Sequence, residues 1–365
     1  MRDDEIDGCV GAPVLKRDAI VDHLRSLIVT GQLKPGRRMP ARSAIESQFR
    51  TGRRLVDQAF RRLEADGFVR NEPRQGTYVS ENPPHLSRYA IVLGSDPEDL
   101  YGGFTAALRR QLAGIEKKRS CHFALYENMT GHSDTLEYQE LLRDIQSHRL
   151  AGLMFRVDAC GAALPNTPFT TIPGIPRVLI SGDLRRAPVC PGVPIVNGAP
   201  RAFVDRALDY LLERGRRRIA LLVGGEFTED DRVDVLSRIG RRGMTTKRPW
   251  VLAFPLKRLA SQVTELLLSF APGERPDGLI LATEALTESV GAGISASGAQ
   301  PGRDLDVVAS CNMPCEGPPL FPMRRLGDDM RERLRIALDL LDRQSRGEQV
   351  PAQVVLPAMF EDEVV

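Results

Sequence analysis

Residues 51–69 read TGRRLVDQAFRRLEADGFV and carry the clearest helical pattern in the N-terminal part of the chain. The apolar residues recur at the spacing of one helix face: Leu55, Val56, Ala59, Phe60 and Leu63. The opposite face is polar and carries Arg53, Arg54, Asp57, Gln58, Arg61 and Arg62. Gly67 follows the last apolar residue, at a position typical of a helix end. The pattern predicts an amphipathic helix with a basic outer face.

The residues around this helix complete a small domain. Before it, Ile20, Leu24, Leu27 and Ile28 recur at the spacing of one apolar helix face. This spacing predicts a first helix that ends near Gly31. Ile45 and Phe49 indicate a short second helix, which only Thr51 and Gly52 separate from the third, as in a helix-turn-helix. After the third helix, residues 68–70 and 76–79 read as two strands joined by a turn at 72–75. Three helices followed by a hairpin predict a winged helix.

Positive charge is concentrated in this domain. The chain of 365 residues has a net charge of only +2, from 50 basic and 48 acidic residues. Residues 12–80 hold 14 basic and 7 acidic residues, a net +7, which leaves −5 for the rest. Within 34–62, nine basic residues stand against Glu46 and Asp57. Because like charges on a small domain repel each other, this excess indicates a polyanionic partner.

Duplex DNA fits such a partner. The N-terminal residues of a recognition helix reach base edges in the major groove, and a hairpin reaches the backbone or the minor groove. The expected DNA contacts come from the segment before the second helix, the second helix, the turn and exposed face of the third helix, and the hairpin. They are Arg38, Arg42, Ser43, Thr51, Arg53, Arg54, Gln58, Arg74, Gly76 and Thr77. The alternative is a winged helix used only for protein contacts.

The domain also resembles the GntR-type winged helix. The resemblance rests on four ordered blocks: GQLKPGRRMP at 31–40, Val56 with Ala59, LEADGFV at 63–69 and QGTYV at 75–79. It implies DNA contacts by Arg38 and Arg53. The chain departs from the family at Ser43 and Asp57, where an arginine is usual, and at Gly52, where a serine is usual. Asp57 is expected either to accept from a cytosine amino group or to orient a neighbouring arginine.

The rest of the chain predicts an α/β body. Residues 81–87 form a short linker with Pro83-Pro84, which divides a winged helix at 12–80 from a body at 88–362. Beyond it, strand and helix patterns alternate, which predicts parallel sheets covered by helices. The expected strands are 89–93, 121–126, 153–155, 178–180, 218–223, 250–254, 277–281 and 305–309. The expected helices are 100–117, 134–148, 203–214, 232–242, 259–270 and 328–344. The length favours two lobes.

The body resembles the LacI-type effector domain, which is similar to periplasmic sugar-binding proteins. The resemblance rests on YAIVL at 89–93, AGLMF at 151–155, LLERGRRRIALL at 211–222, PDGLILATE at 276–284 and LDVVAS at 305–310. It implies a ligand between the lobes, at the carboxyl ends of the strands. The candidate effector-binding residues are Asp96, Tyr101, Asp183, Arg232, Glu284 and Asn312. Val235 replaces a usual glycine, and the effector is left open, with a sugar as one candidate.

The remaining residues indicate neither a metal nor a catalytic site. The six cysteines are scattered, and Cys311 and Cys315 form a lone C-x3-C without a second ligand pair, so we expect ordinary thiols in a reduced, cytoplasmic protein. The acidic N-terminus lacks the apolar stretch of a secretory signal. No phosphate-binding glycine motif is present, and Gly291-x-Gly293 is expected to serve helix packing. We expect no cofactor.

These observations favour a ligand-responsive transcription regulator of the repressor class that binds an operator as a homodimer. They do not indicate an enzyme. One alternative is a GntR-headed regulator with an aminotransferase-like domain, which needs a lysine for pyridoxal phosphate and offers only Lys117, Lys118, Lys247 and Lys257. The others are a binding protein without a DNA role and a regulator that has lost its effector response.

Overall fold

The computed structural model describes residues 16–94, 102–129, 133–156, 167–181, 190–225 and 227–364. By internal contacts the chain divides into two compact units. The first unit runs to Tyr89 and includes the stretches Ser120–His122 and Arg143–Gly152, and the second unit holds the remainder. Among the described residues, no helix combines the length and the hydropathy that a membrane span requires.

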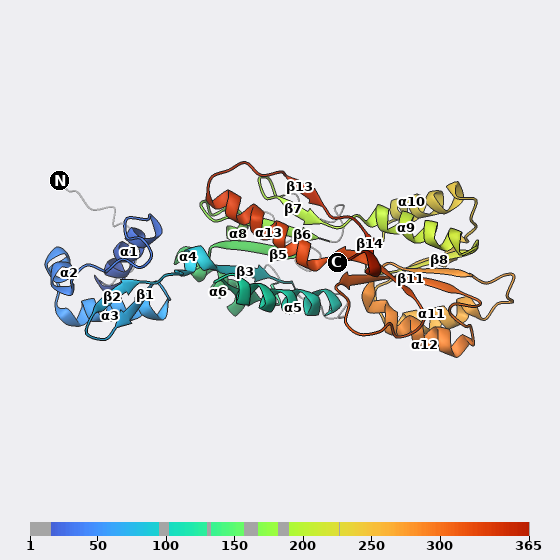
Figure 1. Cartoon of the computed structure of the whole chain (residues 1–365), viewed down its shortest axis with the longest axis horizontal. Coiled ribbons are helices and arrows are strands. Elements are labelled where there is room, and N and C mark those ends of the chain that lie inside the picture. The colour runs from blue at the N-terminus through green and yellow to red at the C-terminus, as the bar shows by residue number, and fades with distance from the viewer. Residues whose placement is uncertain are drawn as a thin grey trace, which may run out of the picture. The chain divides into compact units, whose positions relative to one another are not determined.

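The N-terminal part of the first unit is a winged helix, which spans residues 16–79 (Figure 1). Its elements are α1 (Lys16–Val29), α2 (Arg42–Phe49), α3 (Arg53–Ala65), β1 (Val69–Glu72) and β2 (Gly76–Val79). The apolar faces predicted for the three helices meet in one core, to which the hairpin adds Val69 and Val79. β1 and β2 pair antiparallel, from Val69 opposite Val79 to Glu72 opposite Gly76. The apolar residues of α3 therefore face this core, and its basic residues lie on the opposite, exposed side of the helix.

The stretch after the hairpin contains a helical turn, α4 (Pro84–Ser87), within the segment that we expected to be only a linker. Pro84 supplies a backbone angle suited to the first turn of a helix. The ring of His85 stacks on Phe68, with the ring centroids 5.9 Å apart. Burial, together with the charge of His148, lowers the pKa of His85 to about 4. The imidazole is therefore neutral at pH 7 and packs as an aromatic ring.

In the described part of the body, the strands form two six-stranded sheets. The first sheet has the order β13-β7-β6-β5-β3-β4, and the second has the order β14-β12-β11-β10-β8-β9. The strands of the first are β3 (Arg88–Val92), β4 (His122–Tyr126), β5 (Gly152–Arg156), β6 (Arg177–Ser181), β7 (Ile195–Asn197) and β13 (Gln353–Val355). Those of the second are β8 (Ile219–Gly224), β9 (Val251–Phe254), β10 (Gly278–Leu281), β11 (Asp306–Met313), β12 (Arg324–Asp329) and β14 (Met359–Phe360). The described ladders of the body are parallel, except that β14 pairs antiparallel with β12.

Helices cover both sheets. The described helices of the first lobe are α5 (Gly102–Lys118), α6 (Leu136–Gln146), α8 (Pro168–Thr171) and, from the end of the chain, α13 (Met330–Ser345), which packs on β6 and β7. Those of the second are α9 (Pro200–Glu213), α10 (Glu229–Arg241), α11 (Leu259–Leu268) and α12 (Thr287–Ser297). Single 3-10 turns lie at η3 (Arg248–Trp250), η4 (Glu284–Leu286) and η5 (Glu361–Glu363). Figure 1 shows α9 and α10 on one side of the second sheet and α11 and α12 on the other.

Side-chain alternation along the strands produces these two layers. On β8, Ile219 and Leu221 join the core under α9 and α10, whereas Ala220 and Leu222 join the core under α11 and α12. Successive residues of a strand point to opposite faces, so a strand that is apolar throughout must be covered on both sides. The two-lobed α/β architecture expected from the sequence is confirmed. The additional strands β7, β12, β13 and β14 are too short or too polar to stand out in the sequence.

Gly293 confirms the packing role expected for this part of α12. A Cβ at this position would lie 2.3 Å from the carbonyl oxygen of Ser261 on α11. Gly293→Ala should therefore lower the free energy of unfolding of the second lobe by about 1–3 kcal/mol, as overpacking does. Gly240→Ala is the matched control, because a Cβ there meets nothing within 4 Å and alanine favours a helix by roughly 0.5–1 kcal/mol. Urea unfolding followed by fluorescence of Trp250 measures both; equal effects of the two substitutions would contradict the prediction.

One expectation about the cysteines is wrong. Cys311 and Cys315 are joined by a disulfide, with their Cα atoms 6.6 Å apart. Cys311 lies near the end of β11, and the chain turns after Met313, so the second cysteine returns to within bonding reach of the first. Cys190 is a free thiol, as expected. The described residues contain no group of three or more ligands that could hold a metal ion.

Candidate nucleic-acid interface and effector site

The turn between α2 and α3 presents the start of α3 to solvent. Arg50 takes the left-handed conformation (φ 46°) that ends α2, and the amide of Thr51 donates to the carbonyl of Glu46 at 3.0 Å. Gly52 then begins α3 in an extended conformation. Arg53 is the first residue of α3, and its side chain is 70% exposed. A helix whose first side chain projects in this way has the form required for entry into the major groove.

Arg42 connects α2 with both α3 and the hairpin. Its Nε donates to Oδ1 of Asp57 at 2.7 Å, and its Nη2 lies 3.4 Å from Oγ1 of Thr77. Its guanidinium carbon stands 4.5 Å from the centre of the Phe60 ring. These contacts hold the guanidinium in one place, between the predicted recognition helix and the wing.

The hairpin lies against a second arginine, Arg38. The backbone of Arg38 forms an isolated antiparallel β-bridge with Tyr78 on β2. The amide of Met39 donates to the carbonyl of Thr77 at 2.8 Å. Gly76 has a φ of 118°, and a Cβ there would lie 3.1 Å from Nε of Arg38. Glycine is thus required at this position by both its backbone angle and the close arginine. Arg74, at the hairpin turn, is exposed with a φ of 66°.

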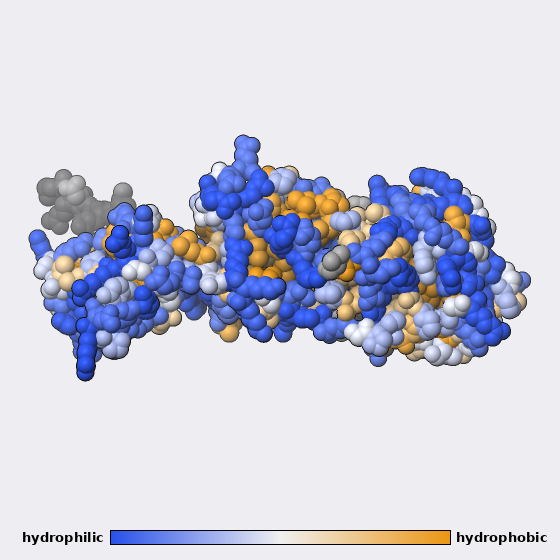
Figure 2. Space-filling model, in the orientation of Figure 1, coloured by the Kyte–Doolittle hydropathy of each residue, from blue (hydrophilic) through white to orange (hydrophobic). Residues whose placement is uncertain are grey.

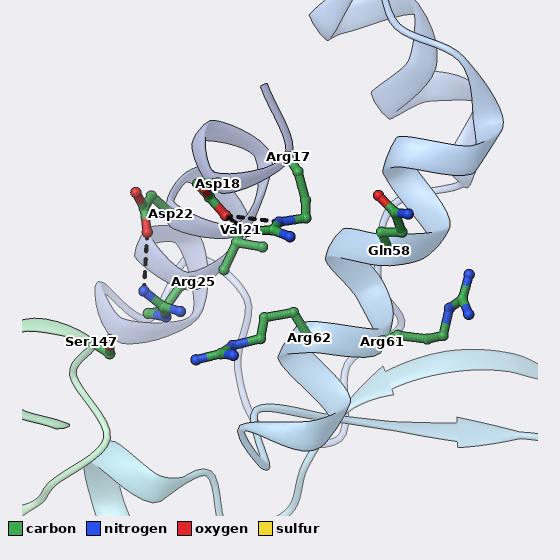
Figure 3. Close-up of a pocket in the computed structure, with 9 residues that line it drawn as sticks. All are labelled: Arg17, Asp18, Val21, Asp22, Arg25, Gln58, Arg61, Arg62 and Ser147. Carbon is green, nitrogen blue, oxygen red and sulfur yellow. Dashed lines mark hydrogen bonds and ion pairs between the residues drawn. The ribbon is translucent and has the colours of Figure 1, made fainter. Parts of the chain in front are cut away.

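The other predicted DNA residues divide between the exposed surface and a groove. Ser43 and Arg54 are exposed, whereas the side chain of Thr77 is buried and meets Arg42. Gln58 lines a groove of about 510 Å³ between α1 and α3 (Figure 3). The groove is also lined by Arg17, Asp18, Val21, Asp22, Arg25, Arg61, Arg62 and Ser147. On the face drawn in Figure 2, hydrophilic residues dominate the surface of the winged helix.

A buried ion pair that sequence reasoning missed supports α3 from behind. The side chain of Asp66 is 3% exposed, and its Oδ2 receives Nη2 of Arg25 at 3.3 Å and Nε of Arg62 at 3.1 Å. Within the same unit, its Oδ1 lies 3.2 Å from Nη1 of Arg149. In the sequence, Arg25 directly follows Leu24 of the apolar face of α1, and a charged residue at such a position indicates a buried partner.

The carboxyl ends of β10 and β11 bring together two of the predicted effector residues. The side-chain amide of Asn312 donates to Oε2 of Glu284, and the backbone amide of Asn312 lies 3.4 Å from the same oxygen. Gly103, in the first turn of α5, faces them: a Cβ there would lie 2.7 Å from Oε2 of Glu284. Since α5 belongs to the first lobe, this pair lies where the two lobes meet.

Arg232 contacts residues other than Glu284 and Asn312. It donates to the carbonyl of Val251 and lies 3.3 Å from the carboxylate of Glu229. It also stands 5.7 Å from the centre of the Phe227 ring. The remaining candidates, Asp96, Tyr101 and Asp183, lie outside the described residues.

Two buried arginines in the first lobe were missed by sequence reasoning. Arg156 ends β5, is 2% exposed and donates to Oγ1 of Thr105 at 3.2 Å. Arg333 on α13 is also 2% exposed; it pairs with Asp328 at 2.6 Å and donates to the carbonyl of Ser181 at 2.9 Å. The available signal was an arginine at the end of the otherwise apolar run of β5.

The winged helix and the body each resemble known proteins. Residues 16–79 match the family model of bacterial regulatory proteins, gntR family. These residues form a GntR-type winged helix. The sequence resemblance is thereby confirmed for this segment, and the GntR-type blocks at 31–40 and 63–69 fall within the match.

Relatives and solved structures extend the comparison beyond the GntR-type winged helix. The arabinose metabolism transcriptional repressor of Geobacillus stearothermophilus is 24% identical over 253 residues, which cover 68% of this chain and 64% of that protein. The chain thus spans about 64% of the length of that relative. A LacI-family regulatory protein of Chloroflexus aggregans has a TM-score of 0.56 at 18% identity, over 75% of this chain and 96% of the other.

A third comparison includes a bound sugar. The periplasmic binding protein/LacI transcriptional regulator of Alkaliphilus metalliredigens, solved with D-xylulofuranose, has a TM-score of 0.54 at 14% identity. The match covers 75% of this chain and 97% of that one. The body therefore has the two-lobed fold of LacI-type effector domains, as the sequence led us to expect.

Proposed function

We propose that the chain is a DNA-binding transcription regulator of the repressor class, whose operator affinity is controlled by a small molecule bound between its two lobes. The observation that carries this proposal is the exposed basic face of α3, beginning at Arg53, in a GntR-type winged helix. The arabinose metabolism repressor, to which the chain is similar, supports the direction of control. A regulator that acts on an operator belongs in the cytoplasm, where we place it.

DNA binding is tested by selecting an operator from a random duplex pool with the full chain and measuring affinity at several salt concentrations. Each phosphate contact contributes a slope of about −0.9 in the plot of log K against log salt. We expect a steep negative slope and a preference for the selected sequence over a scrambled duplex. Neither a slope nor a preference would be found if the winged helix served only protein contacts.

For the effector, we propose a small polyhydroxylated ligand of the sugar class, contacted by Glu284, Asn312 and Arg156. Carboxylate, amide and guanidinium groups bind hydroxyls, and the comparison structure with D-xylulofuranose supports this class. Ligand closure of the lobes would shift the population of states with different operator affinity. Thermal shift against a panel of pentoses and hexoses tests this proposal, with Glu284→Gln as the variant that should lose the shift. A regulator that has lost its effector response would show no shift with any sugar.

The fold gives no support to the aminotransferase alternative. That alternative needs an aminotransferase-like body, whereas the body matches LacI-type structures. We therefore propose a regulator and not an enzyme, with no cofactor. An absorbance scan of the purified chain should show no band of bound pyridoxal phosphate.

We also propose that the chain acts as a homodimer, since two winged helices can read a palindromic operator. A candidate surface lies on the outer side of α11, where Leu259, Leu266 and, just beyond the helix, Phe270 are 39%, 62% and 49% exposed. The spacing of seven residues places Leu259 and Leu266 on one face of the helix, and Phe270 follows two residues after the helix ends. Partly buried Val263 extends the same stripe.

Leu266→Glu combined with Phe270→Glu should convert the dimer to monomer, with a rise of at least tenfold in the dimer dissociation constant, which is about 1.4 kcal/mol. The physical reason is that a charge buried without a partner opposes association. Light scattering after size-exclusion chromatography measures the mass. Val233→Glu on α10 is the control, because Val233 is 56% exposed and, among the described residues, α10 has no second exposed large hydrophobic side chain. An unchanged mass of the double variant would place the dimer surface elsewhere.

A further inference from the structure

A single carboxylate interrupts the basic outer face of α3. Asp57 lies one turn after Arg53, with Arg54 and Arg61 on the same exposed side of the helix. Near DNA phosphates a carboxylate is repelled, so its charge alone should weaken binding to every duplex. Its contacts indicate a role that offsets this repulsion.

Each oxygen of Asp57 faces a different arginine. Oδ1 accepts from Nε of Arg42 at 2.7 Å, and Oδ2 lies 3.6 Å from Nε of Arg53. Both arginines are thus engaged through Nε. A guanidinium has five N–H donors, so the Nη groups, which form the edge suited to guanine or phosphate, are not taken by Asp57.

The two arginines differ in how firmly they are held. Arg42 is 30% exposed and has two further contacts, to the Phe60 ring and to Thr77. Arg53 is 70% exposed and, among the described residues, its ion pair is with Asp57. Asp57 therefore fixes one guanidinium between helix and wing and restrains another at the start of α3.

We propose that Asp57 is a specificity-determining positioning residue, which orders Arg42 and Arg53 for the operator at the expense of binding to unrelated DNA. This inference rests on the proposed function. Arg42, held by Asp57, supplies from α2 the cation that Ser43 does not provide. Ordering these side chains before binding reduces the entropy lost when they meet fixed base edges. Non-specific binding depends on phosphate charge, needs no such order and is only opposed by the carboxylate.

The proposal predicts opposite effects on two kinds of DNA. Asp57→Asn should weaken operator binding about tenfold, within the range that one bidentate base contact contributes. The same substitution should strengthen binding to a scrambled duplex by roughly twofold to fivefold at low salt. Anisotropy titrations of the full chain on both duplexes measure the two affinities, and melting followed by circular dichroism checks the fold of each variant.

Glu64→Gln is the matched control, because Glu64 is an exposed carboxylate on the same helix and forms no ion pair with the residues that the structure describes. It should leave the ratio of operator to scrambled affinity unchanged. Arg42→Lys keeps the positive charge but loses the planar, bidentate guanidinium. It should therefore lower the affinity for the operator and leave the affinity for the scrambled duplex unchanged. In an Arg42→Ala background, Asp57→Asn should no longer show most of its operator loss.

Tighter binding of Asp57→Asn to both duplexes would overturn the proposal, since Asp57 would then only repel DNA. Equal affinities before and after the substitution would overturn it as well. If the unchanged chain binds no duplex in a salt-dependent way, the proposed function itself fails, and that result is separate from the behaviour of the variant.

Discussion

Replacing Arg53 with glutamate should lower the affinity of the chain for its operator about a hundredfold. Arg53 begins α3 and is 70% exposed, at the end of the helix from which base edges are reached. A lost bidentate contact lowers binding by about 1–3 kcal/mol, and the new carboxylate adds repulsion from phosphate. Exchanging a cation for an anion should also make the slope of log K against log salt less steep, by the amount that roughly two phosphate contacts contribute.

Anisotropy titrations at several salt concentrations measure both quantities. Arg241→Glu makes the same charge change on α10, where the guanidinium meets Ser237 at 3.0 Å, and should leave affinity and slope as they are. Arg53→Gln should fall between the two. If Arg53→Glu binds the operator as tightly as the unchanged chain, Arg53 is not a DNA contact.

Asp66→Ala should destabilise the winged helix by about 3 kcal/mol, near the lower end of the range for breaking a buried ion pair. The side chain of Arg25 is 8% exposed, and removal of Asp66 leaves it, among the described residues, with Asp22 as its ion-pair partner, a carboxylate that is 65% exposed. Arg62 loses its partner at the same time. A domain of this size has a stability of about 5–15 kcal/mol, so much of it would be lost.

Hydrogen exchange of amides in α1 and α3 is the suitable measurement, because unfolding of a chain with several parts is not a single two-state transition. Asp22→Ala is the control: it removes the exposed carboxylate from the same arginine and should lower stability by less than about 1 kcal/mol. Adding Arg25→Leu to Asp66→Ala should recover part of the loss, since the buried guanidinium of Arg25 is then removed. Similar losses in the two single variants would refute a dominant role for Asp66.

Much of the fold could be predicted from the sequence because its elements have strong local periodicity. The apolar positions Leu24 on α1 and Phe60 on α3 are buried in the core, as their spacing predicts. The buried strands β8 and β10 were visible as apolar runs between turns. β13 and β14 were not, because edge strands of three and two residues leave no period to detect.

The candidate sites were predictable only in outline. Position after a strand placed Glu284 and Asn312 together, and the structure shows them in contact. The same reasoning for Arg232 did not bring it to this pair, since its long side chain reaches back to the carbonyl of Val251. Arg156 and Arg333 went unnoticed because an arginine-rich chain gives a single arginine little weight.

The sequence by itself determined that this protein has a basic winged helix followed by an acidic α/β body. Periodicity, turn residues and charge lie along the chain, so they can be read without knowing which segments meet. Only the tertiary structure decided that Asp57 holds Arg42 and Arg53, that Asp66 neutralises Arg25, and that Cys311 bonds Cys315. The physical reason is that the role of a charged or reactive side chain depends on the partner that folding brings to it, and the spacing of residues along the chain does not specify that partner.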